Sequence, residues 1–175
     1  MSTSRRPSPL LMATLGLLSC GEPTVEELCA GEGEPEILLG HGEGSDFVPF
    51  EPGEEVFITI APQGGFGVTI RASTSGLYAG AEQGAAPISL VLRSRWKGEP
   101  SGEFDWGDVV LYCMEDGSGL FWGAIVPLDP EKFPTEADLE QLDGERVELE
   151  AEATDARGEV VIGAAEVTLR LREDG

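Results

Sequence analysis

The sequence predicts an all-β fold, an Ig-like antiparallel β-sandwich of about seven to nine strands in residues 36–175. From Pro35 onward, short runs of alternating apolar and polar residues are separated by Gly, Pro and Asp clusters at a spacing typical of all-β domains. No helical segments alternate with these runs, which argues against an α/β enzyme scaffold. A closed barrel is the alternative architecture. Apolar residues make up 41% of the 175 residues, enough for a core despite a formal net charge of -22.

The strand pattern occurs in seven runs, at 55–62, 65–73, 88–95, 109–114, 120–126, 146–154 and 160–172. Turn residues join the first two runs, the fourth and fifth, and the last two, so each of these pairs is expected to form a hairpin. The runs 109–114 and 120–126 are apolar at nearly every position, which predicts central strands buried on both faces. In the other runs only alternate residues are expected to point inward: Phe66, Val68, Ile70, Ala72, Ile88, Leu90, Leu92, Val147, Leu149, Ala151, Ala153, Val167, Leu169 and Leu171. Val56, Ile58 and Ile60 likewise share one face of their strand.

One short helix is expected over 136–142, where Thr135 and Asp138 have the spacing of a capping box. Two long Gly-rich stretches, 74–87 and 96–107, are expected to be loops. Because loops carry most binding residues, the candidate ligand contacts are the aromatic residues in these stretches, namely Tyr78, Trp96 and Trp106.

Residues 1–19 have the features of a lipoprotein signal peptide. Two arginines precede an apolar run at 10–18, which is too short to span a bilayer. The run ends in Leu-Leu-Ser-Cys and resembles the lipobox of bacterial lipoproteins, in which the cysteine is lipidated. Cys20 is therefore expected to become the acylated N-terminus, and residues 20–35, rich in Gly, Glu and Pro, a flexible linker. An unmodified cysteine after an ordinary secretory signal is the alternative.

The predicted address is the outer membrane, because Gly21 follows the cysteine in place of the Asp that retains some lipoproteins in the inner membrane. Removal of residues 1–19 takes away two arginines and no acid, so the mature charge is -24. The only dense basic cluster is Arg93, Arg95 and Lys97, whereas nucleic-acid binding needs a basic stripe. We therefore expect no nucleic-acid partner.

Cysteine usage predicts one disulfide. With Cys20 lipidated, Cys29 and Cys113 remain in an oxidising compartment and are expected to pair. The bond would close a loop of more than eighty residues and would hold the N-terminal arm against the domain. A reactive thiol would need a basic setting, which neither flanking sequence supplies.

Two segments carry a family resemblance. Residues 37–71 contain a Gly-rich segment, a Phe-Val-Pro-Phe step and a Pro-Gln-Gly-Gly-Phe turn, and residues 142–158 contain the first strand and the turn of the last predicted hairpin. The first segment resembles a group of uncharacterised myxobacterial envelope lipoproteins with an Ig-like β-sandwich domain, and the second is similar to the last hairpin of many bacterial Ig-like domains. The resemblance implies the fold and the envelope address, and it implies no activity.

No catalytic constellation stands out. His41 is the only histidine, so a metal site made of several histidines cannot be assembled, and we expect His41 to be an exposed loop residue with no catalytic role. The acidic loops 43–46, 115–118 and 129–131 are calcium candidates, although none has EF-hand spacing. We therefore expect no metal or cofactor, and a non-catalytic, lipid-anchored module that binds an envelope protein or glycan or has a structural role. The alternatives are a carboxylate-dependent hydrolase and a calcium-dependent binding module.

Overall fold

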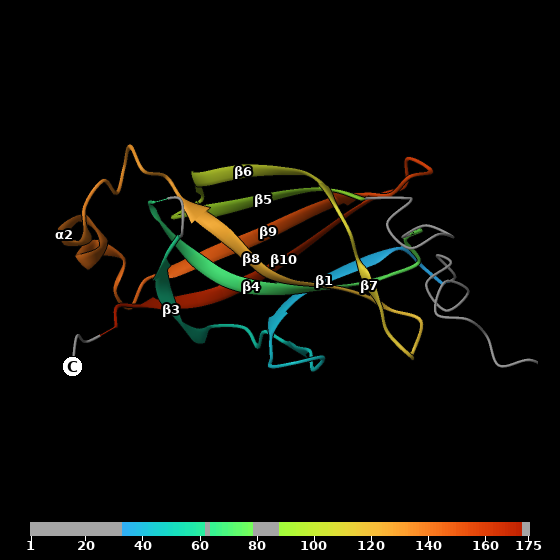
Figure 1. Ribbon diagram of the computed structural model, residues 1–175. Coiled ribbons are helices and arrows are strands. Elements are labelled where there is room, and N and C mark those ends of the chain that lie inside the picture. The colour runs from blue at the N-terminus through green and yellow to red at the C-terminus, as the bar shows by residue number, and fades with distance from the viewer. Residues whose placement is uncertain (1–32, 62–63, 79–87, 173–175) are drawn as a thin grey trace, which may run out of the picture.

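The computed structural model describes residues 33–61, 64–78 and 88–172, and they form an all-β, sandwich-like domain with one short helical segment (Figure 1). The strands are β1 (Glu36–His41), β2 (Val48–Pro49), β3 (Glu54–Ile60), β4 (Phe66–Ser75), β5 (Ile88–Trp96), β6 (Glu99–Val109), β7 (Tyr112–Cys113), β8 (Gly119–Leu128), β9 (Arg146–Thr154) and β10 (Val160–Arg170). The helical segment consists of α2 (Glu136–Leu139) and the 3-10 turn η1 (Glu140–Leu142). The predicted fold class is confirmed, with ten strands in the described residues, two of them only two residues long.

Strand β3 joins the two layers of the sandwich. Its second half, Ile58–Ile60, pairs antiparallel with β4, which also pairs with β1 and β8. Its first half pairs with β10 and so continues into the layer β10-β9-β5-β6. The β3–β10 pair is parallel, which corrects the purely antiparallel prediction. These two strands are far apart in the chain, so no tight hairpin imposes an antiparallel orientation on them.

The core lies between the two layers and contains the residues that period-two alternation selects. Most predicted inward positions are at most 1% exposed: Val68, Ile70, Ala72, Ile88, Leu90, Leu92, Val147, Leu149, Ala151, Ala153, Val167 and Leu169. Phe66 and Leu171, near the strand ends, are only half-buried. Ile60 follows the alternation of β3 but lies at its end and is 63% exposed. The predicted inward orientation is therefore confirmed in the middle of the strands and is wrong for Ile60 at the end of β3.

The predicted two-sided burial of 109–114 and 120–126 is wrong. The hairpin itself is present, because Tyr112 of β7 lies opposite Leu120 of β8, but β7 is short and forms an edge. Val110, Tyr112 and Trp122 are 46%, 52% and 39% exposed. The rings of Tyr112 and Trp122 stack at a centroid distance of 4.0 Å, so these two residues cover each other on the surface instead of entering the core.

The predicted loop at 96–107 is also wrong, because most of it is strand β6, which pairs with β5 along its length after a tight turn at Lys97 and Gly98. The glycines that suggested a loop have other roles. A side chain at Gly102 would overlap the carbonyl oxygen of Pro127 in β8, so glycine permits close approach of the two strands. The β5–β6 register also shifts twice, which weakens the alternation in the sequence.

The predicted helix over 136–142 is confirmed as α2 and η1. The backbone N–H of Thr135 donates to Oδ2 of Asp138 at 2.9 Å, as expected for the capping box. Leu139 and Leu142 are buried beneath the helical segment and attach it to the end of the sandwich.

The two ends of the sandwich are distinct. Glu36, where the chain enters β1, lies opposite Ser75 at one end of β4, whereas Phe66 at the other end lies opposite Ile60. A ten-residue strand spans about 30 Å, so the entering chain and the α2 end are that far apart (Figure 1). Within the described residues, no helix has the length and apolar character needed to cross a membrane.

Candidate functional site

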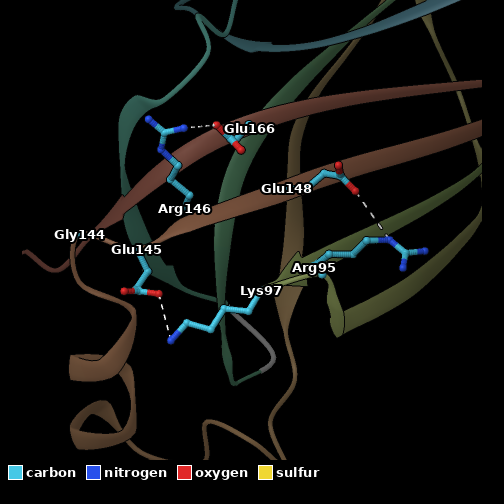
Figure 2. A pocket seen from close by; sticks show the side chains of 8 residues that line it. Arg95, Lys97, Gly144, Glu145, Arg146, Glu148 and Glu166 are labelled. Atoms are coloured by element: carbon cyan, nitrogen blue, oxygen red, sulfur yellow. Dashed lines mark hydrogen bonds and ion pairs between the residues drawn. The ribbon is translucent and has the colours of Figure 1, made fainter.

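A hollow of about 510 Å³ opens at the α2 end of the sandwich, on the outer side of the β10-β9-β5-β6 layer (Figure 2). The sequence forms it by placing the β5–β6 turn beside the start of β9, with glycines on both segments. Its lining consists of Arg95, Lys97, Gly98, Gly144, Glu145, Arg146, Glu148 and Glu166. Antiparallel register, not sequence proximity, brings these residues together, because Arg95 lies opposite Glu148 and Glu148 lies opposite Glu166.

Each cation in this hollow faces one carboxylate. Lys97 Nζ lies 3.2 Å from Glu145, a guanidinium nitrogen of Arg146 lies 2.9 Å from Glu166, and Nε of Arg95 lies 3.7 Å from Glu148 (Figure 2). The lining is therefore charge-balanced. Pairs on the surface contribute about 0.2–1 kcal/mol each, so these side chains remain able to exchange partners. The arrangement offers donors and acceptors to a polar ligand and gives no net attraction for a polyanion.

The turn residue Lys97 is in an unfavourable conformation. Its φ is 55°, and it is the only non-glycine residue with positive φ in the described part of the chain. A hairpin turn with positive φ at both central positions favours Asn or Gly at the first. The Lys97 ammonium lies 4.2 Å from the centre of the Trp96 ring, and the Trp96 indole N–H donates to Glu145 at 3.0 Å. That hydrogen bond and then Lys97 lower the pKa of Glu145, which keeps it an anion.

Arg93, the remaining member of the basic cluster, holds three strands together. Its guanidinium contacts Glu103 of β6 at 2.7 Å and Glu150 and Glu152 of β9 at 3.0 and 2.9 Å. The hydrogen bond to Glu103 and those to the two β9 carboxylates raise the pKa of Arg93. Acids thus flank the cluster that the sequence identified, and its members form no continuous basic stripe on this face.

The three predicted aromatic contacts do not form one site. Trp96, at the α2 end, packs against Phe133 with ring centroids 6.0 Å apart. Trp106 packs against Phe121 of β8 at 5.8 Å, and its buried indole N–H has no hydrogen-bond acceptor in the described residues. The backbone N–H of Tyr78 donates to Asp155 at the other end of the sandwich. Trp96 and Trp106 therefore pack against different aromatic rings, and Tyr78 lies at the opposite end of the sandwich from Trp96.

The candidate calcium loops use their oxygens within the fold. Arg71 donates to the carbonyl oxygens of Gly44 at 2.7 Å and Asp46 at 2.9 Å, so a guanidinium already occupies the inside of the 43–46 loop. Asp116 and Asp129 accept backbone N–H groups in their own turns. No group of three or more His, Cys, Asp or Glu suited to a metal is found in the residues that the structure describes.

His41 lies at the end of β1 instead of in a loop. Its Nε2 is 2.9 Å from a carboxylate oxygen of Glu54, and its side chain is 47% exposed. The ring also lies against Phe50 at a centroid distance of 5.6 Å. The residue therefore connects the β1 end to the start of β3.

Of the predicted cysteine sites, only Cys113 falls within the described residues. Its sulfur is disulfide-bonded, and it sits half-buried in the edge strand β7, not in the central strand that was expected. Cys29, its predicted partner, and the predicted lipidation site Cys20 lie outside the described residues. The pairing of Cys29 with Cys113 and the acylation of Cys20 remain predictions.

Sequence reasoning missed Asp155, which organises the end of the sandwich opposite α2. The sequence marks it only as a turn residue, yet its carboxylate is fully buried. Burial by itself raises the pKa of Asp155. Hydrogen bonds from the backbone N–H groups of Tyr78 and Glu159, and from Arg157, together have a larger opposite effect, so the pKa of Asp155 is lowered. No local pattern reveals this, because Tyr78 is 77 positions away.

The chain matches no protein-family model, and no curated protein is significantly similar to it.

Proposed function

We propose that the chain is a lipid-anchored, non-catalytic lipoprotein of the cell envelope, held at the outer membrane through Cys20, whose β-sandwich acts as a binding or structural module. The observation that carries the proposal is the order of segments in the sequence. A positive flank, a short apolar run and a lipobox-like cysteine precede a Gly- and Glu-rich linker and then the sandwich. The resemblance to myxobacterial envelope lipoproteins supports the same address.

Three carboxyls of the described residues are unsuited to act as the general acid of a hydrolase. Asp116, Glu145 and Asp155 all have lowered pKa values, in the first case because the Ser118 hydroxyl and backbone N–H donate to the carboxylate. A general acid in a glycosidase-like reaction needs a raised pKa instead. These carboxylates are fixed anions that accept hydrogen bonds within the fold, which suits a stable framework for binding.

The anchor is tested by replacing Cys20 with Ala and fractionating cells. Two acyl chains bind a bilayer firmly, whereas an acidic domain is repelled by anionic lipids, so the variant should leave the membrane fraction. Ser19→Ala is the matched control, because it keeps a small residue before the cysteine. Wild type and control should incorporate a labelled fatty acid. The proposal fails if the Cys20→Ala protein still sediments with membranes after a salt wash.

A further inference from the structure

A second hollow, of about 650 Å³, lies at the same end of the sandwich between β3, the start of β4, α2 and the segment after β10. Its apolar lining comes mainly from Ile58, Ile60, Phe66, Leu139 and Leu171. We call it the α2 groove. Unlike the charge-balanced hollow, it combines a continuous apolar floor with acids on its helical side.

Ile60 is the most exposed of the five apolar residues named above. It is 63% exposed, whereas Ile58, two residues earlier on the same strand, is 7% exposed and forms part of the floor. On the opposite side, Leu139 of α2 is 3% exposed. Scattered exposed apolar residues are normal, but an exposed side chain at the mouth of an apolar hollow forms a continuous surface that water solvates poorly.

The acids on the groove are not neutralised. Glu136 and Glu140 line it from α2 and η1, and neither makes an ion pair within the described residues. The only cation in the lining is Arg172, which lies over the Phe57 ring at 6.0 Å. The carboxylates of the first hollow, by contrast, each face a cation. The α2 groove therefore attracts positive charge beside its apolar floor.

We propose that the α2 groove docks a segment of a partner protein in which apolar side chains are flanked by Lys or Arg. The apolar side chains would lie over Ile60 and Ile58, and the cations would meet Glu136 and Glu140. Charge selects this occupant. A second mature copy would bring its own acids and a net charge of -24 against the rim, and an anionic membrane would be repelled in the same way.

The position of the groove agrees with the proposal. It lies at the end of β4 opposite the point where the chain enters the sandwich, so an anchored domain can present it to a partner away from the linker. This inference rests on the proposed role as a binding module and names the class of partner.

The test uses the mature chain held by its anchor in phosphatidylcholine nanodiscs, with empty discs subtracted. The probe is a fluorescent synthetic peptide with Leu on one helical face and Lys on the other, and its counterpart has Glu in place of Lys. Co-elution of the protein with the discs reports the anchor separately, so failure of the anchor and failure of the groove are distinguishable. Wild type should bind the Leu/Lys peptide and not the Leu/Glu peptide.

Matched variants separate the groove from general surface charge. Ile60→Ser should weaken binding by about fivefold or more, as for loss of an interface anchor. Ile162→Ser is the control, because Ile162 is 62% exposed on β10 and does not line the groove. Both residues are surface positions, so neither change should unfold the domain.

A second pair of variants tests the rim. The double change Glu136→Gln and Glu140→Gln should weaken binding and reduce its salt dependence, whereas Glu43→Gln with Glu115→Gln, which removes equal charge elsewhere, should not. The proposal is overturned if wild type does not bind the Leu/Lys peptide or if groove and control variants bind equally. It is also overturned if sedimentation shows a dimer that Ile60→Ser dissociates, because a second copy would then occupy the groove.

Discussion

The carboxylate of Asp155 is the interaction whose removal should most clearly destabilise the end of the sandwich opposite α2. Its Oδ1 accepts the backbone N–H groups of Arg157 at 2.8 Å and Glu159 at 2.9 Å. Its Oδ2 accepts the backbone N–H of Tyr78 at 3.0 Å and Nε of Arg157 at 2.9 Å. The side chain has no exposed surface, so water cannot replace these bonds. Asp155→Asn keeps the shape and changes only Oδ2 and the charge.

The expected loss of unfolding free energy follows from these contacts. The amide NH2 of the variant would face the backbone N–H of Tyr78, which would lose its acceptor; a buried unsatisfied donor costs about 1–3 kcal/mol. The bonds to Oδ1 would lose their charge assistance, about 1 kcal/mol more. Arg157 is half exposed and can turn to solvent, so its contribution is small. The expected destabilisation is about 2–4 kcal/mol.

Urea unfolding followed by tryptophan fluorescence measures this loss. Asp116→Asn is the matched control, because Asp116 also accepts hydrogen bonds in a turn and has a lowered pKa but is exposed. Asp116→Asn should lower the free energy of unfolding by less than about 1 kcal/mol. Equal losses in the two variants, or no loss in Asp155→Asn, would refute the argument that burial gives Asp155 its importance.

The stability difference between wild type and Asp155→Asn should also depend on pH. The pKa of Asp155 is lowered in the folded protein, so its stabilising effect is present above the unfolded pKa of about 3.9 and is lost as pH falls through the folded pKa. The free-energy difference between wild type and Asp155→Asn should therefore be constant near neutral pH and shrink on acidification below about pH 4. A difference that grows on acidification would contradict this sign.

Further predictions concern the core, the β6–β8 contact and the disulfide. Leu149 is 0% exposed in β9, so Leu149→Ala should cost about 2–5 kcal/mol in urea unfolding. Gly102→Ala should also lower the urea midpoint, because the added methyl group overlaps a β8 carbonyl oxygen; an unchanged midpoint would show that β6 can move away. Peptide mapping of non-reduced protein should find Cys29 linked to Cys113, and a link from Cys113 to any other cysteine would contradict the pairing.

The strands that the sequence predicted best are those with one face in the core. In β9, Leu149 and Ala151 alternate with Glu148 and Glu150, and burial follows that alternation directly. Strand β6 was missed because it is an edge strand whose register shifts and glycines interrupt the pattern. Apolarity alone was misleading at Trp122, where a stack with an aromatic neighbour covers a surface residue.

The candidate sites were less predictable, because strand register and the packing at the α2 end of the sandwich bring their residues together. Glu145 and Lys97 are 48 positions apart yet form an ion pair, since the start of β9 lies beside the β5–β6 turn. The α2 groove likewise combines Ile60 with Glu136, from opposite halves of the chain. Local patterns identify such residues as strand or helix positions and carry no information about which distant residue they meet.

The central claim, that this sandwich is a lipid-anchored envelope module, is tested most directly by the intact mass of the protein extracted from cell membranes. The extracted chain should begin at Cys20, carry the added mass of a diacylglycerol, with or without an N-linked acyl chain, and contain one disulfide. A chain with an unmodified cysteine at position 20, or one recovered only outside the membrane fraction, would contradict it.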